Sequence, residues 1–268
     1  MYAYIINLDR SQDRRAHMVA ELKKTDMLHE FVSAVDGRNL DTSDPTLVSL
    51  EEMSTRSKFP VNSAASVLSH IQCYERMIAA ERDAALVLED DAILPADINC
   101  LADSVATQLT GAEVALLSFN SGEPLKISRE GAVDVVGDRM LALPIDALQP
   151  ASAAAYVITR EACERLIKFL LPIRTNADQF GLFYQEGAID RLRCVVPLSV
   201  QNSAKFLSTQ GSYSLGNGLK ARLLWPIVKL ELPLLHQILV HRRQRIQNQW
   251  SQWEMVDMPF IERPSRFD

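Results

Sequence analysis

Three consecutive acids, Glu89, Asp90 and Asp91, are the side chains in this sequence with the clearest capacity for chemistry. They directly follow the apolar run 84–88, which is typical of a strand buried on both faces. Strand alternation sends Glu89 and Asp91 to one side and Asp90 to the other. Adjacent carboxylates raise one another's pKa unless a cation neutralises them, and Mg²⁺ or Mn²⁺ suits such oxygen ligands. The pattern therefore favours a divalent-metal site that meets substrate phosphates, with a solvated turn after the strand as the alternative.

The segments around these acids predict an α/β fold. Runs typical of buried strands cover residues 2–8, 31–35, 84–88, 114–118, 153–158 and 194–196. Segments with helical spacing or helix caps cover residues 11–24, 63–80, 95–109 and 159–171, and a small hairpin is expected within 120–150. This alternation predicts a mainly parallel sheet covered by helices on both faces, whose ligands collect at the carboxyl ends of the strands.

Length and composition indicate one folded domain, or one domain with an appendage. The 268 residues are 47% hydrophobic, which supplies a sizeable core and argues against global disorder. The four cysteines, at positions 73, 100, 163 and 194, are too widely spaced for a zinc site and indicate free thiols in a reducing compartment. No basic, cleavable leader precedes the first strand, and no window of about 18 apolar residues predicts a membrane span, so we expect a cytoplasmic location.

The C-terminal part of the sequence combines basic, apolar and tryptophan residues. Six basic residues and one acid give residues 219–248 a net charge of +5, which leaves −11 on the rest of a chain whose total is −6. The acidic body argues against a nucleic-acid partner. The apolar runs 223–228 and 232–235, with Trp250 and Trp253, suit contact with an anionic membrane surface. Packing on the rest of the chain, or on a second copy in a homo-oligomer, is the alternative.

Several short motifs, in a characteristic order over roughly residues 4–201, resemble glycosyltransferase family 25, the lipopolysaccharide (lipooligosaccharide) glycosyltransferases. The motifs are Ile6-Asn7-Leu8, Arg14-Arg15, Ala34-Val35-Asp36-Gly37, Leu68-Ser69-His70, Leu86 to Ala92, Ala155 to Arg160, Asp178, and Pro197 to Gln201. The resemblance implies a GT-A-like fold, a UDP-sugar donor and a divalent metal. In such enzymes the acidic triplet corresponds to the Asp-x-Asp metal motif.

The sequence departs from the family pattern before Leu68-Ser69-His70. Where the family usually shows Gly-Glu-x-Gly-Cys, this chain has Asn62-Ser63-Ala64-Ala65-Ser66. The missing glutamate removes a charge near the donor, so the donor choice can differ. A non-catalytic glycan-binding module with a GT-A-like fold is therefore the first alternative. A metal-dependent phosphohydrolase is the second, although the second cluster of His and Asp that a two-metal site needs is missing.

The resemblance and the strand ends together assign candidate roles. Glu89 and Asp91 are the expected metal ligands, and Asp178 is the expected base for the acceptor hydroxyl, with Asp190 in reserve. The candidates on the donor side are Asn7, Leu8, Arg14, Asp36, His70, Asp90 and Gln201. Each of these has a structural alternative: a helix-surface ion pair, a turn, a core histidine or a strand-end polar group. Tyr156 is expected in the core.

These inferences describe an inverting hexosyltransferase. We expect residues 1–215 to form a GT-A-like catalytic domain and residues 216–268 a helical C-terminal appendage. The enzyme would move a hexose, galactose first and glucose next, from a UDP-sugar to a lipid-linked glycan of the lipopolysaccharide type. That acceptor implies a peripheral position on the inner face of the cytoplasmic membrane.

Overall fold

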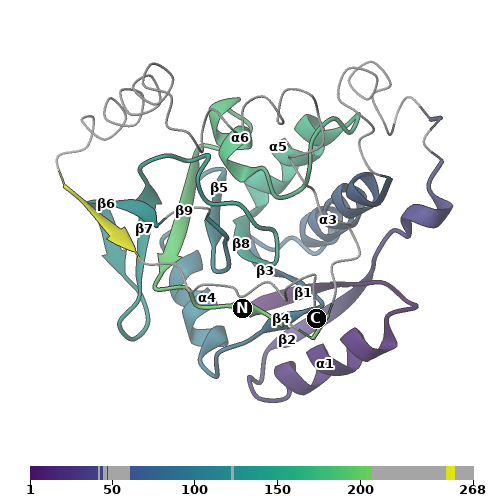
Figure 1. The fold of residues 1–268 in the computed structure, drawn as a ribbon, viewed down its shortest axis with the longest axis horizontal. Helices are drawn as coiled ribbons and strands as arrows, with labels where there is room; N and C mark the ends of the chain where they lie inside the picture. Colours follow the sequence, from purple (N-terminus) through teal and green to yellow (C-terminus); the bar gives the residue numbers. More distant parts are fainter. Residues whose placement is uncertain are drawn as a thin grey trace, which may run out of the picture.

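A nine-stranded sheet forms the centre of the molecule (Figure 1). The computed structural model describes residues 1–41, 43–44, 47, 61–121, 124–203, 205–206 and 252–256. The strands of the sheet are β1 (Tyr2–Asn7), β2 (Leu28–Ser33), β3 (Ala84–Glu89), β5 (Glu113–Leu116), β6 (Leu125–Asp134), β7 (Met140–Pro144), β8 (Ala155–Thr159), β9 (Arg191–Val196) and β11 (Trp253–Val256). Their order across the sheet is β11-β6-β7-β9-β5-β8-β3-β1-β2. A separate antiparallel pair joins β4 (Ala92–Ile93) to β10 (Gln201–Asn202).

The large sheet is mixed rather than mainly parallel. β1 runs parallel to β2 and β3, and β5 runs parallel to β9, whereas the other five pairings are antiparallel. β8 lies antiparallel between β3 and β5. The carboxyl ends of β1, β3, β5 and β9 therefore meet at one edge of the sheet, which the amino end of β8 shares.

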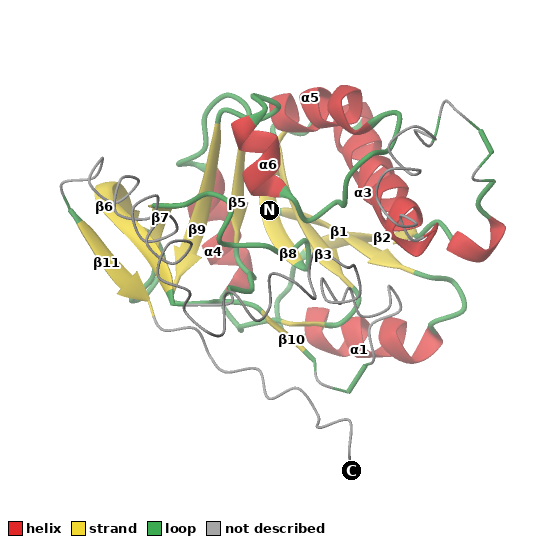
Figure 2. Cartoon of the chain, turned by 45° about the horizontal axis from the view of Figure 1, so that its top comes forward, coloured by secondary structure: helices red, strands yellow, loops and turns green. Residues whose placement is uncertain are grey.

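Helices cover both faces of the sheet, as the sequence predicts (Figures 1 and 2). The helices α3 (Val61–Ala79), α5 (Arg160–Leu170) and α6 (Phe180–Gln185) pack on one face, whereas α1 (Gln12–Leu22) and α4 (Ile98–Ala106) pack on the other. Alternate strand residues supply the two cores: Val87 of β3 faces α3, and its neighbours Leu86 and Leu88 face α1 and α4. A 3₁₀ turn, η1 (Gly37–Asn39), follows β2 and contacts α3.

The C-terminal part of the chain corrects one prediction. Residues 253–256, within the predicted helical appendage 216–268, form β11, which pairs antiparallel with β6 at one side of the sheet. The basic segment 219–248 and Trp250 lie outside the described residues. No helix in the described part of the chain combines the length and the apolar character needed to cross a bilayer.

Candidate active site

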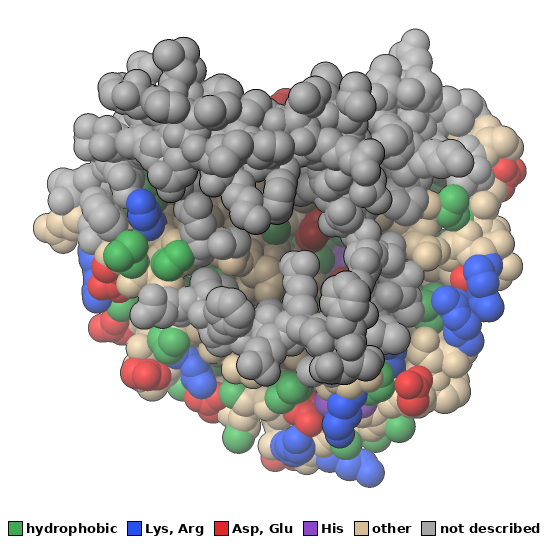
Figure 3. Space-filling model, viewed as in Figure 1, with side chains coloured by type: hydrophobic (Ala, Val, Ile, Leu, Met, Phe, Trp, Pro, Cys, Tyr) green, Lys and Arg blue, Asp and Glu red, His purple; other side chains and the backbone are tan. Residues whose placement is uncertain are grey.

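A cavity of about 380 Å³ opens at the sheet edge where β1 and β3 end. Its walls come from the chain after β1, the acidic triplet after β3, the first turns of α3, and the segment 176–178 before α6. Figure 3 shows acidic and histidine side chains inside the hollow at the centre of this face. Polar side chains therefore line a cavity at this edge of the sheet, which is where an α/β fold is expected to bind ligands.

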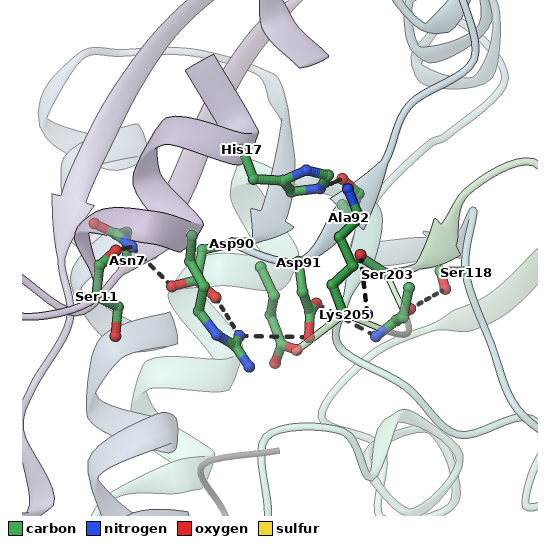
Figure 4. Close-up of polar contacts among 12 residues, drawn as sticks. Asn7, Ser11, His17, Asp90, Asp91, Ala92, Ser118, Ser203 and Lys205 are labelled. Carbon is green, nitrogen blue, oxygen red and sulfur yellow. Dashed lines mark hydrogen bonds and ion pairs between the residues drawn. The ribbon is translucent and has the colours of Figure 1, made fainter. Parts of the chain in front are cut away.

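Asp90 is held on the α1 side of β3 and acts as an anchor. Asn7 Nδ2 at the end of β1 donates to Asp90 Oδ2 at 2.8 Å, and Arg14 Nη1 from α1 donates to Asp90 Oδ1 at 2.6 Å (Figure 4). Asn7 and Asp90 are both buried. Because this carboxylate already has charged and neutral donors, it ties β1, α1 and β3 together and fixes the turn that carries its neighbours.

Glu89 and Asp91 line the cavity together with Asp90, but neither of them is held by both Asn7 and Arg14 as Asp90 is. Burial and the nearby Glu89 carboxylate raise the pKa of Asp91 to about 7, although Arg14 opposes the shift. Arg14 Nη1 lies 3.4 Å from Asp91 Oδ2, farther than its 2.6 Å contact with Asp90. The pair Glu89 and Asp91 thus carries negative charge that the surrounding protein neutralises only in part.

The residues present fit a divalent cation that completes its coordination with ligand atoms. Within the described ranges, no group of three or more His, Cys, Asp and Glu side chains is arranged to hold a metal by itself. Mg²⁺-type ions are commonly bound by one or two carboxylates together with substrate phosphates and water. Glu89 and Asp91 supply two such carboxylates, and a cation beside them would offset the burial and repulsion that raise the pKa of Asp91.

The small β4–β10 pair places further polar groups beside Asp91. Asn202 Nδ2 donates to Asp91 Oδ1 at 3.4 Å, Ser118 Oγ donates to Asn202 Oδ1 at 3.3 Å, and the Ser203 amide donates to the Asp91 carbonyl at 2.7 Å (Figure 4). Asn202 and Ser203 line the cavity. The sequence analysis missed Asn202 and Ser118. Ser118 is the last residue of the predicted strand 114–118, which is a signal that could have found it, whereas Asn202 is placed by the short β4–β10 pair.

Asp178 lines the cavity from the side opposite α1, where the segment before α6 crosses the sheet edge. Burial raises the pKa of Asp178, the Gln179 side chain opposes this effect, and the Glu89 carboxylate adds to the rise. The nearby Asn176 Oδ1 is buried and has no hydrogen-bond partner within the described part of the chain. Asn176 also lines the cavity, so this wall offers one acid and one unsatisfied acceptor to a ligand. Asn176 is a third residue that the sequence analysis missed.

The first turns of α3 form a wall of small polar side chains where the family motif differs. Asn62, Ser63, Ala65 and Ser66 line the cavity there. Gly37 of η1 lies so close to this wall that a Cβ on it would come within 2.4 Å of Asn62 Oδ1 and 3.2 Å of its Cα. The absence of a side chain at Gly37 therefore lets η1 pack directly on the start of α3.

Three predicted donor-side residues lie outside the cavity lining: Asp36, Gln201 and Asn7, which is buried with its side chain on Asp90. Asp36 binds Arg38 and Arg10, and the hydrogen bonds from Arg38 are the main cause of its lowered pKa. Gln201 and Asn202 are both exposed on β10, and the Asn202 side chain is the one that contacts Asp91. Asn202 is therefore a further candidate beside Gln201, and Asp36 stabilises a turn through Arg38.

Asp190, the reserve base, lies at the opposite edge of the sheet. It precedes β9, accepts a hydrogen bond from the Ala112 amide at 3.0 Å and pairs with Arg165 at 2.8 Å. The Ala112 hydrogen bond is the main cause of its lowered pKa. Its position does not suit a base in this cavity, and its lowered pKa makes it a weak proton acceptor. The predicted residues that do come together at the cavity are Leu8, Arg14, His70, Glu89, Asp90, Asp91 and Asp178.

The part of the chain that carries the acidic triplet is similar to known proteins. Residues 1–128 match the family model of glycosyltransferase family 25 (LPS biosynthesis protein). Within these residues the chain is similar to glycosyltransferase family 25. This confirms the resemblance inferred from the motifs, and the family 25 match contains the acidic triplet and His70 but ends before Asp178 and Asn202.

Two curated relatives extend the comparison. The chain is 31% identical over 96 residues to a glycosyltransferase 25 family member of Aedes aegypti, and 32% identical over 94 residues to procollagen galactosyltransferase 2 of Homo sapiens. These alignments cover 34% and 33% of this chain, but only 16% and 15% of the two relatives. The relation to family 25 therefore concerns a limited region of much longer proteins.

Proposed function

We propose that this chain is a metal-dependent, inverting glycosyltransferase with a GT-A-like fold that uses a UDP-sugar. The observation that carries the proposal is the pair Glu89 and Asp91, which faces a cavity at the carboxyl edge of the sheet within the region matching family 25. An under-neutralised carboxylate pair in a cavity suits a cation together with a diphosphate. Neither alternative function accounts for this pair together with the family match.

Some side chains of this site would bind the leaving diphosphate, and another would activate the acceptor. Glu89 and Asp91 would hold Mn²⁺ or Mg²⁺, which when bound stabilises the departing diphosphate as a Lewis acid. Arg14 and Asp90 keep the triplet's turn in place, and Asn202 positions the Asp91 carboxylate from the other side. These contacts are already made in the structure, so little reorganisation is needed when the donor binds.

Asp178 is the group we propose as the base. As the acceptor oxygen forms its bond to the anomeric carbon and the bond to the diphosphate breaks, the hydroxyl proton passes to the Asp178 carboxylate. Attack on the face opposite the leaving group gives inversion. The raised pKa of Asp178, caused first by burial, moves this carboxylate closer to the range in which a general base works best.

The hexose and the acceptor are proposed from the relatives' names and the cavity. One relative is named a procollagen galactosyltransferase, and the family description refers to LPS biosynthesis. We therefore propose galactose, with glucose next, and a lipid-linked glycan of the lipopolysaccharide type. Such an acceptor would bring the basic segment 219–248 to an anionic membrane surface on the cytoplasmic side.

A donor screen tests the proposal. The purified chain is incubated with Mn²⁺ and a panel of UDP-sugars, with and without a short glycan acceptor, and free UDP and glycosylated product are measured. We expect UDP-galactose or UDP-glucose to give product that depends on the acceptor. Glycan binding without any UDP release would support a non-catalytic module, and phosphate release from simple phosphate esters would support a phosphohydrolase.

A further inference from the structure

Four polar side chains form a row that runs from the protein core to the cavity. The Tyr74 and Tyr156 hydroxyls are 2.9 Å apart, and the Tyr156 hydroxyl lies 2.7 Å from His70 Nδ1. The other ring nitrogen, His70 Nε2, lies 3.8 Å from Glu89 Oε1. Tyr74, Tyr156 and His70 are each at most 1% exposed, so water cannot replace these partners. The row connects α3, β8 and the end of β3.

The Glu89 carboxylate at the cavity end of the row determines the direction of the hydrogen bonds. If Tyr74 donates to Tyr156 and Tyr156 donates to His70 Nδ1, the neutral ring carries its proton on Nε2, and that N–H points to a carboxylate. In the reverse order the Nε2 lone pair would face the Glu89 carboxylate. In the first arrangement the Nε2–H faces the negative Glu89 carboxylate, which attracts it. In the second, the Nε2 lone pair and the carboxylate repel each other, so electrostatics favours the first arrangement.

Packing holds the His70 ring in this orientation. The ring stacks on Tyr156, with centroids 5.8 Å apart and planes at 29°, and Tyr156 in turn packs against Phe180 at 4.9 Å. His70 and Tyr156 are both buried against the hydrophobic core on the α3 side of the sheet. The ring therefore cannot flip to exchange its nitrogens without disturbing α3, β8 and α6 together.

We propose that His70 is a positioning residue that orients the Glu89 carboxylate through its Nε2–H, with the tautomer set by Tyr156 and, behind it, Tyr74. The 3.8 Å separation makes this an electrostatic contact rather than a short hydrogen bond. The role of Glu89 as a metal ligand rests on the proposed function, whereas the tautomer does not. A histidine that orients a ligand carboxylate from behind belongs to the supporting contacts on which metal affinity depends.

The tautomer is measured first, by long-range ¹H–¹⁵N NMR of the ¹⁵N-histidine-labelled full chain, with His70→Gln to assign the signal. We expect His70 to be neutral with its proton on Nε2. Glu89→Gln should shift the Nε2 signal, and the exposed Glu164→Gln on α5 should not. The proposal is overturned if Nδ1 carries the proton, if both nitrogens are protonated, or if Glu89→Gln leaves the Nε2 signal unchanged.

Matched tyrosine variants test how the tautomer is set. Tyr156→Phe removes the group that donates to Nδ1, so His70 should populate both tautomers, while Tyr74→Phe should leave the Nε2–H form intact. Both variants lose one buried hydroxyl, so a general loss of stability would affect them alike. Equal behaviour of the two variants overturns the assignment to Tyr156.

Metal binding is the second readout, and it is kept apart from transfer activity. Mn²⁺ affinity is measured by calorimetry for the wild type, His70→Gln and His70→Leu. Glutamine can keep an N–H toward Glu89, whereas leucine cannot, so we expect His70→Leu to bind about 10- to 100-fold more weakly and His70→Gln to stay close to the wild type. Equal losses in both variants contradict the positioning role. A wild type that does not bind Mn²⁺ contradicts the proposed metal site, while the NMR result still decides the role of His70.

Discussion

Asp91 lies where burial and neighbouring charge oppose its ionisation. Its pKa is raised from 3.8 to about 7, first by burial and then by Glu89. For an acid whose pKa is higher in the folded than in the unfolded chain, protonation favours the folded state. The stabilising effect is fully present below the unfolded value of 3.8 and is lost as the pH rises through about 7. A bound cation would remove this cost of ionisation.

The melting temperature of the metal-free chain should therefore respond to pH at this residue. Relative to Asp91→Asn, which cannot ionise, the wild type should lose stability between about pH 5.5 and pH 8. Addition of Mn²⁺ should raise the wild-type melting temperature more at pH 8 than at pH 5.5, and should have little effect on Asp91→Asn. Parallel pH profiles for the two proteins, with and without Mn²⁺, would refute an elevated Asp91 pKa.

Asp178 and Asp190 form a matched pair for testing the base. Asp178→Asn keeps the shape of the side chain and removes the proton acceptor in the cavity, so kcat should fall by about 100-fold or more, with UDP binding little changed. Asp190→Asn alters an acid at the opposite sheet edge and should leave kcat within a few fold. Steady-state kinetics on both variants decides the matter, because an Asp178→Asn enzyme with near-normal kcat has another base.

At the scale of elements, Gln201 and Asn202 of β10 are both exposed, but the Asn202 side chain is the one that contacts Asp91. We expect Asn202→Ala to weaken Mn²⁺ binding by about 10-fold, because a group that orients the ligand is lost. Gln201→Ala, one residue away on the same strand, should bind like the wild type. Calorimetric titration of both variants would reject this account if their affinities changed equally.

The same pair shows what the sequence can and cannot predict about the site. Glu89 to Asp91 follow an uninterrupted apolar run, so their position at a strand end was predictable, as were α1, α3, α4 and α5. The choice of Asn202 over Gln201 depends on the register of a two-residue strand, which has no periodic pattern to reveal it. Asp36 was misplaced for a similar reason, because its binding by Arg10 and Arg38 depends on the path of a turn.

At the scale of the whole molecule, strand direction was the least predictable property. The alternation of strands and helices suggested a mainly parallel sheet, but β8 enters antiparallel between β3 and β5. A fully buried strand such as β8 has the same pattern in either direction, and its neighbours are chosen by contacts far along the chain. The antiparallel entry has a functional consequence, since it brings the segment 151–153, before β8, to the cavity.

The far C-terminal strand also belongs to the architecture of the whole molecule. β11 pairs with β6 from Trp253↔Ser128 to Val256↔Leu125, and Arg129 Nε donates to the Glu254 carboxylate at 2.8 Å. Deletion of residues 252–268 should therefore lower the melting temperature by at least about 3 °C, because each kcal/mol lost corresponds to about 2–4 °C in a domain of this size. Calorimetric comparison of the deletion with Glu254→Ala, which keeps the strand, separates the stability due to the β11–β6 pairing from that due to the Arg129–Glu254 ion pair. An unchanged melting temperature in the deletion would contradict the pairing.

The most direct test of the central claim is UDP-sugar turnover by Asp91→Ala in the presence of Mn²⁺. Asp91 lies at a strand end rather than among core side chains, so we expect the variant to remain folded by thermal melting and to lose nearly all transfer. Glu164→Ala, an exposed acid on α5, is the control and should retain full turnover. Near-normal turnover by a folded Asp91→Ala protein would contradict the assignment of the cavity as a metal-dependent transfer site.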